Sequence, residues 1–140
     1  MGEILVPVDG STYAEDALAY AIEHFPDEDI TTLHVVEVPG GYFAAAAGDP
    51  ESFPVVEKHK EEGEALLEAI EAEAETLGGS VETAMETGDP ADEILEYAQE
   101  NDVEEIVIGS RGISGVGRIV FGSVAEKVVR RSNIPVVVVH

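Results

Sequence analysis

Short runs rich in valine and isoleucine alternate along this chain with longer segments in which apolar residues recur every three or four positions. Runs of the first kind are typical of strands buried on both faces, and segments of the second kind are typical of amphipathic helices. This alternation predicts an α/β fold in which helices cover both faces of a parallel sheet. The five expected strands lie at residues 4–8, 30–38, 81–87, 105–108 and 135–139.

Several of the expected helices have recognisable start signals. Thr12 with Glu15, and Ser123 with Glu126, have the spacing of a capping box, so we expect Thr12 and Ser123 to cap two helices. Asp89 directly before a proline predicts a third helix start, because proline is favoured at the first helical position.

The longest helix is expected over residues 55–77, with Leu77 on its apolar face and a glycine pair directly after it. Residues 39–54 contain many glycine and proline residues and a run of four alanines, so we expect a loop there.

The charge of the chain is strongly unbalanced. Thirty acidic residues face seven basic ones, which gives a net charge of −23. The abundant and periodic apolar residues argue against disorder, and the scarcity of lysine and arginine argues against nucleic-acid binding. A halophilic surface, of the kind expected in a haloarchaeal-like source, fits best, because concentrated cations screen the repulsion between carboxylates.

Other classes of protein are excluded by composition. The chain has no cysteine, which excludes disulfides, thiolate catalysis and cysteine metal sites. The four histidines are scattered, so we expect no histidine metal site. No segment approaches the roughly 18 apolar residues of a membrane span, and the N-terminus lacks the features of a secretion signal. We therefore expect a cytoplasmic protein that does not contact a membrane.

A glycine-rich segment follows the fourth expected strand. Five glycines occur in the fourteen residues from Gly109 to Gly122, and the segment leads into a helix N-terminus, where free N–H groups favour phosphate. Five of the seven basic residues lie in residues 109–140, among them Arg111 and Arg118. The segment is neither a dinucleotide fingerprint nor a P-loop. Since ligands bind at the carboxyl ends of parallel strands, we expect an anionic ligand here.

The pattern Gly109-x2-Gly112-x9-Gly122-Ser123 resembles the nucleotide-binding pattern of the universal stress protein family. The resemblance extends, in the order found in the family, to ILVPVDGS (residues 4–11), LHV (33–35), GDP (88–90) and SNIPV (132–136). It thus covers residues 1–140 as one nucleotide-binding domain. It implies a Rossmann-like open sandwich with a five-stranded sheet of order 3-2-1-4-5, and a homodimer. Because the glycine pattern is present, the chain resembles the ATP-binding branch of the family.

The resemblance also implies roles for individual residues. The expected ligand is ATP, or AMP or ADP, with Mg²⁺. Asp9 would lie near the ribose and Val35 would touch the adenine. Arg111 stands where family members vary, and it would contact a phosphate. The complete set of expected nucleotide-binding residues is Pro7, Val8, Asp9, Val35, Gly109, Arg111, Gly112, Gly122, Ser123 and Val124.

Several of these residues also have a plainer explanation. Asp9 precedes a glycine and a serine, which is typical of a turn. Ser123 can be a helix N-cap alone, and Arg111 and Arg118 can be solvated charges.

Three functions remain open at this point: a stress-related regulatory nucleotide-binding protein, a slow ATPase, and a structural dimeric module without a ligand. The glycine pattern argues against the third. Asp9 is the only acid evident near the expected site, and hydrolysis needs a group that positions water, so we favour binding over efficient catalysis.

The last expected strand carries four consecutive valines, Val136, Val137, Val138 and Val139. In the implied strand order this strand lies at an edge of the sheet, where unpaired backbone groups and apolar side chains promote association. We therefore expect two copies of the chain to pair through this strand about a two-fold axis.

Removing salt should destabilise the protein. All but one of the thirty acids, and only two of the seven bases, lie in residues 1–108, so repulsion there grows as screening is lost. We expect the melting temperature to fall by at least about 5 °C between molar and low salt, which corresponds to roughly 1 kcal/mol in a domain of this size. Thermal melts across a salt series measure this. A melting temperature that stays constant or rises on dilution contradicts the halophilic interpretation.

Overall fold

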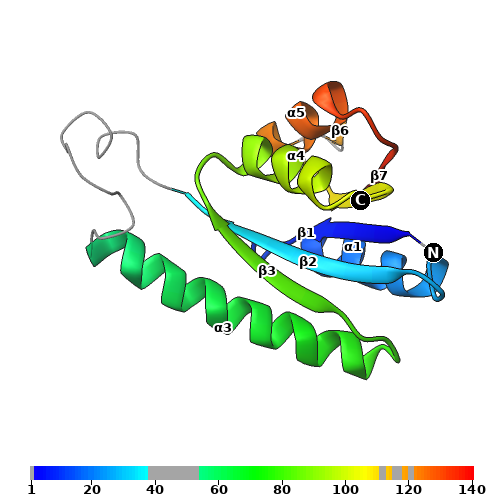
Figure 1. The fold of residues 1–140 in the computed structure, drawn as a ribbon, viewed down its shortest axis with the longest axis horizontal. Helices are drawn as coiled ribbons and strands as arrows, with labels where there is room; N and C mark the ends of the chain where they lie inside the picture. Colours follow the sequence, from blue (N-terminus) through cyan, green and yellow to red (C-terminus); the bar gives the residue numbers. More distant parts are fainter. Residues whose placement is uncertain (1, 38–53, 111–112, 115–117, 120–121) are drawn as a thin grey trace.

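A five-stranded parallel sheet forms the centre of the computed structural model, which describes residues 2–37, 54–110, 113–114, 118–119 and 122–140 (Figure 1). The strand order is β3-β2-β1-β4-β7, which confirms the expected order 3-2-1-4-5. Every pairing in this sheet is parallel. The strands are β1 (Glu3–Pro7), β2 (Asp29–Val36), β3 (Glu82–Thr87), β4 (Glu105–Gly109) and β7 (Val136–Val139).

Helices cover both faces of the sheet, as the alternation in the sequence predicts. The described helices are α1 (Thr12–His24), α3 (Pro54–Thr76), α4 (Pro90–Glu100) and α5 (Ser123–Arg131). In Figure 1, α4 and α5 lie on one side of the sheet, and α1 and α3 lie on the other. None of the helices in the described ranges is both long and apolar enough to cross a bilayer.

Two separate apolar clusters fill the spaces between the sheet and its helices. Ile4 and Val6 of β1 pack with α1 and α3, whereas Leu5 packs with α4 and α5. Successive strand residues point to opposite faces, so a strand that is buried on both sides needs apolar residues at every position. This requirement explains the unbroken apolar run in β1.

A short antiparallel ladder lies inside the glycine-rich segment. It pairs β5 (Ile113–Ser114) with β6 (Arg118–Ile119), and it was not expected from the sequence. Strands of two residues are too short to produce a recognisable alternation.

The N-caps expected from the two capping boxes are both wrong by one residue. Ser11 caps α1, and its Oγ accepts a hydrogen bond from the N–H of Ala14 at 3.3 Å, so Thr12 is the first helical residue. Gly122 caps α5 without a side-chain bond, which leaves Ser123 as the first helical residue. An N-cap must have extended backbone angles, and Ser11 and Gly122 have them. Asp89 caps α4 as expected.

The end of α3 also differs from expectation at one side chain. The helix ends at Thr76, and Gly78 adopts a φ of 86° in the turn that follows. This turn takes Leu77 away from the apolar face, and its side chain is 41% exposed instead of buried.

Acidic side chains crowd around Glu93 on α4. Partial burial raises the pKa of Glu93 above the ordinary glutamate value, and the nearby charges of Glu96, Glu86, Asp92 and Glu100 raise it further. The ionised form of Glu93 is therefore less favourable in the folded protein than in the unfolded chain. Ionisation of Glu93 therefore lowers the free energy of unfolding as the pH rises through the pKa that Glu93 has in the folded protein.

The substitution Glu93→Gln should stabilise the fold at neutral pH, by less than about 0.5 kcal/mol because the site is near the surface. The gain should vanish as the pH falls below about 4.3, where glutamate is protonated in the unfolded chain as well. Urea unfolding of both proteins across a pH series measures this difference. The control is Glu71→Gln, which removes one exposed carboxylate from α3. An equal gain from the control, or a gain independent of pH, contradicts the local explanation.

Candidate functional site

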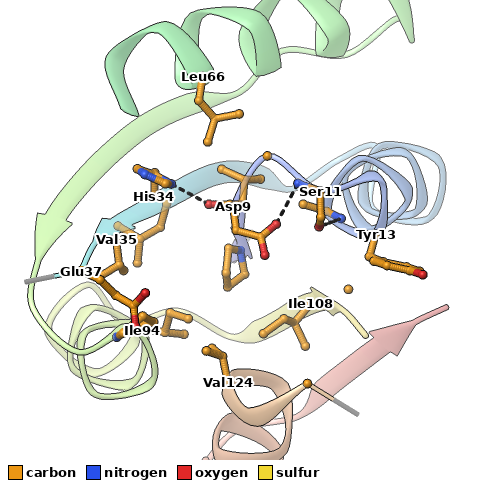
Figure 2. Close-up of a pocket in the computed structure, with 18 of the residues that line it drawn as sticks. Asp9, Ser11, Tyr13, His34, Val35, Glu37, Leu66, Ile94, Ile108 and Val124 are labelled. Atoms are coloured by element: carbon orange, nitrogen blue, oxygen red, sulfur yellow. Dashed lines mark hydrogen bonds between the residues drawn. The ribbon is translucent and has the colours of Figure 1, made fainter. Parts of the chain in front are cut away.

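A pocket of about 500 Å³ opens at the carboxyl ends of β1, β2 and β4 (Figure 2). The strand order reverses here, because β1 has β2 on one side and β4 on the other. Open α/β sheets bind ligands at such a reversal, since the connections leave in opposite directions and a crevice remains between them. The lining residues come from these strand ends, from the first turns of α1, α4 and α5, and from the first half of α3.

The turn between β1 and α1 forms one wall of the pocket. The Asp9 carboxylate accepts a hydrogen bond from the N–H of Ser11 at 3.0 Å, and Gly10 between them has a φ of 87°. The structural role expected for Asp9 as a turn residue is thus present. A carboxylate can accept about four hydrogen bonds, so the exposed Asp9 retains capacity for a ligand.

The backbone of Val8 is bonded to β2 through both of its polar groups. Its N–H donates to the carbonyl oxygen of Leu33 at 2.9 Å. Its carbonyl oxygen lies 2.9 Å from Nδ1 of His34. The turn that begins at Val8 is therefore attached directly to the neighbouring strand.

Apolar side chains line the pocket from several directions. Figure 2 shows Val35 and Ile94 on the side of β2 and α4, Ile108 and Val124 on the side of β4 and α5, and Leu66 of α3 opposite them. An arrangement of this kind suits a flat ligand group with apolar faces, which would be removed from water between these walls.

The end of β4 and the start of α5 form the polar part of the pocket. A side chain at Gly109 would place its Cβ 2.3 Å from the carbonyl oxygen of Tyr13, so only glycine fits there. Ser110 is 1% exposed, and within the described ranges its Oγ has no hydrogen-bond partner. The α5 helix begins with buried Gly122 and no side-chain cap. Its first-turn N–H groups have no partner within the helix and favour an anion.

The ionisable side chains of the pocket are mostly acidic. The described lining residues include Asp9, Glu37, Glu62, His34 and His59, and none of them is lysine or arginine. Asp9 is thus one of three acids at the pocket, rather than the single acid expected from the sequence. In the described part of the chain, no group of three or more histidines and carboxylates is placed to hold a metal ion.

The structure brings together most of the residues singled out in the sequence. Arg111 and Gly112 lie outside the described residues. A role in nucleotide binding stays a prediction for the whole set. The eight described members all line the pocket: Pro7, Val8, Asp9, Val35, Gly109, Gly122, Ser123 and Val124.

Sequence reasoning missed other lining residues, including Tyr13, His34, Leu66, Ile94 and Ser110. The sequence could have indicated two of them, because His34 lies in the LHV motif and Ser110 lies between two of the expected site residues. Leu66 belongs to the apolar residues that recur every three or four positions along α3, and this periodicity predicts a core residue. It does not indicate that α3 borders the pocket.

Comparison with known proteins gives a consistent result. The model of the universal stress protein family matches residues 1–140. Universal stress protein MJ0531 of Methanocaldococcus jannaschii is 36% identical over 140 residues, which cover 98% of this chain and 81% of the relative.

Solved structures share the fold over nearly the whole chain. The universal stress protein from Archaeoglobus fulgidus is 27% identical with a TM-score of 0.79, and the match covers 100% of this chain and 99% of that one. A family member from Arabidopsis thaliana, crystallised with AMP bound, is 24% identical with a TM-score of 0.71. That match covers 99% of this chain and 91% of the plant protein, and at this identity it shows the fold alone.

Proposed function

Because this chain belongs to the universal stress protein family, we propose that it is a stress-related regulatory protein whose pocket binds ATP, or AMP or ADP. The observation that carries the proposal is the combination of two features in one pocket. Apolar walls suited to a base lie beside a glycine-lined helix N-terminus suited to phosphates. Partner proteins would respond to the nucleotide-bound state. The plant relative with bound AMP has the same fold, which agrees with this proposal.

The adenosine part of the ligand would occupy the β1 and β2 side of the pocket. Pro7 and Val8 would flank the adenosine, and Val35 would touch the adenine ring. Asp9 would accept a hydrogen bond from a ribose hydroxyl, because its carboxylate is exposed at the pocket and is only partly used by Ser11.

The phosphates would lie at the β4 and α5 side. Gly109 and Gly122 allow the backbone to approach closely, Ser123 and Val124 supply first-turn N–H groups, and the Ser110 hydroxyl would gain a partner. Arg111 and Gly112 would complete this part of the site. Mg²⁺ would accompany the nucleotide, held mainly by phosphate oxygens and water. Its charge would offset repulsion between the phosphates and the carboxylates around the pocket.

A slow ATPase is the alternative. Hydrolysis needs a group that positions water at the terminal phosphate. Figure 2 places Glu37 beside Val35 and Ile94, on the β2 side, whereas the proposed phosphate site is at β4 and α5. We therefore favour binding as the function of the pocket.

We further propose a homodimer through β7. In the described part of the chain, β7 pairs only with β4, and its four valines are half-buried. A second copy of β7 would pair with the free edge and cover these side chains. The protein is proposed to act in the cytoplasm of a salt-adapted cell.

Calorimetry at high salt should show binding of ATP with Mg²⁺ at least about tenfold tighter than binding of GTP, since the pocket contacts are proposed to fit adenine.

Gly122→Val should abolish binding without unfolding the protein, because its side chain would occupy space needed by the phosphates. The control is Gly78→Asn, which lies outside the pocket in a left-handed turn where an added Cβ meets nothing within 4 Å. Equal affinity for GTP, or no heat with any nucleotide, contradicts the proposal.

Light scattering at micromolar concentration and high salt should give the mass of a dimer. Ile106 donates its N–H to Pro135 and Ser110 donates its N–H to Val139, so in this parallel ladder the N–H of Val137 faces β4 and the N–H of Val138 faces the free edge. Val138→Pro removes this free-edge donor and should shift the population toward monomer. Val138→Thr keeps the donor and serves as the control. A monomer mass for the unaltered protein refutes the dimer.

A further inference from the structure

We propose that His34 is a positioning residue, which fixes the Val8–Asp9 turn of the pocket through a hydrogen bond to the Val8 carbonyl. The consequence for ligand affinity rests on the proposed nucleotide function. The positioning of the turn itself is a property of the protein without ligand. His34 lines the pocket, but none of the roles assigned above uses its side chain.

The hydrogen bond to Val8 determines the tautomer of the neutral His34 ring. Nδ1 lies 2.9 Å from the Val8 carbonyl oxygen, and a carbonyl oxygen can only accept. The neutral ring must therefore carry its proton on Nδ1 and leave Nε2 without one. This assignment follows from the partner of Nδ1 alone.

The same bond controls the direction of the peptide that begins the turn. A peptide unit is planar, and the described chain has no cis peptide bonds, so fixing the Val8 carbonyl also fixes the N–H of Asp9. The Val8 N–H is bonded to Leu33 at the same time. Figure 2 shows His34 on one side of this turn and the Asp9 carboxylate on the other. His34 thus holds the turn through its backbone and leaves the Asp9 carboxylate available to the ligand.

A glycine in α3 provides the space for the His34 ring. A Cβ at Gly63 would lie 2.7 Å from Cδ2 of His34 and 3.0 Å from Sδ of Met85. Gly63 is buried in the interior of a 23-residue helix, where glycine is otherwise unfavourable. The need to accommodate the ring explains this glycine, and it connects α3 to the geometry of the turn.

A simple structural role for His34, in which the ring only fills space, makes a different prediction. Asparagine places its Nδ2 donor at the same distance along the side chain as Nδ1 of histidine, whereas leucine has a similar bulk and no donor. If the hydrogen bond matters, His34→Asn should retain function and His34→Leu should lose it. If only the filled volume matters, the leucine variant should be at least as good as the asparagine variant.

The test compares these variants by calorimetry with ATP and Mg²⁺ at high salt. We expect His34→Leu to bind roughly tenfold more weakly, as for loss of one hydrogen bond, and His34→Asn to stay within about threefold of the unaltered protein. Gly63→Ala should also weaken binding by displacing the ring, although alanine favours the helix. In the His34→Ala background, Gly63→Ala should weaken binding much less, since the ring is gone and only the flexible Met85 side chain remains close to the new Cβ.

Two measurements without ligand separate this inference from the proposed function. Nitrogen-15 NMR should show the Nδ1–H tautomer of His34 in the free protein. Amide exchange at Ser11, whose N–H is bonded to Asp9, should be faster in His34→Leu than in His34→Asn. If no nucleotide binds, the proposed function fails while these results still decide the positioning role. An Nε2–H tautomer, equal exchange rates, or equal affinities of the leucine and asparagine variants overturn the inference. If His34→Leu does not fold, the affinity of Gly63→Ala and the tautomer of His34 in the unaltered protein test the inference instead.

Discussion

The parallel pairing of β1 between β2 and β4 is the constraint on which the rest of the structure depends. It places the carboxyl ends of three strands at one edge of the sheet and sends their connections in opposite directions. The pocket exists because of this reversal, and its residues lie far apart in the sequence for the same reason. Since the central strands are buried on both faces, their polar backbone groups must be bonded within the sheet. The strand ends, where this pairing stops, are the places where backbone groups become available to a ligand.

The turn after β1 shows how closely the core and the pocket are connected. Val8 is 4% exposed and belongs to the apolar cluster beneath α1 and α3, yet its backbone begins the turn that carries Asp9 into the pocket. At the other wall, the backbone of Tyr13 approaches Gly109 so closely that no side chain fits between α1 and the end of β4. Rigid elements therefore hold both walls, and a bound ligand would meet a site that is largely formed in advance.

The sequence contained most of the information about the fold and less about the site. Strand order and helix placement were predictable because the apolar periodicities are strong and the motifs occur in the order of a known family. The start of α1 was displaced by one residue, since Ser11 and Thr12 are both good caps and only backbone angles decide between them. The sequence could place His34 near the site, but it could not show the hydrogen bond of His34 to Val8 or the contact of its ring with Gly63. Their roles depend on how α3 crosses the sheet, which places a helix glycine against a strand histidine nearly thirty residues earlier in the chain.

The proposed site assignments depend on the pocket at the strand reversal binding an adenine nucleotide. Native mass spectrometry of protein purified gently at high salt, and then supplied with ATP and Mg²⁺, tests this most directly. The account predicts that the mass of each chain increases by the mass of one adenine nucleotide. When a labelled nucleotide is bound first, an excess of unlabelled ATP should displace it. A protein that keeps its bare mass after ATP and Mg²⁺ are added contradicts the account, and so does one that carries a guanine nucleotide equally well.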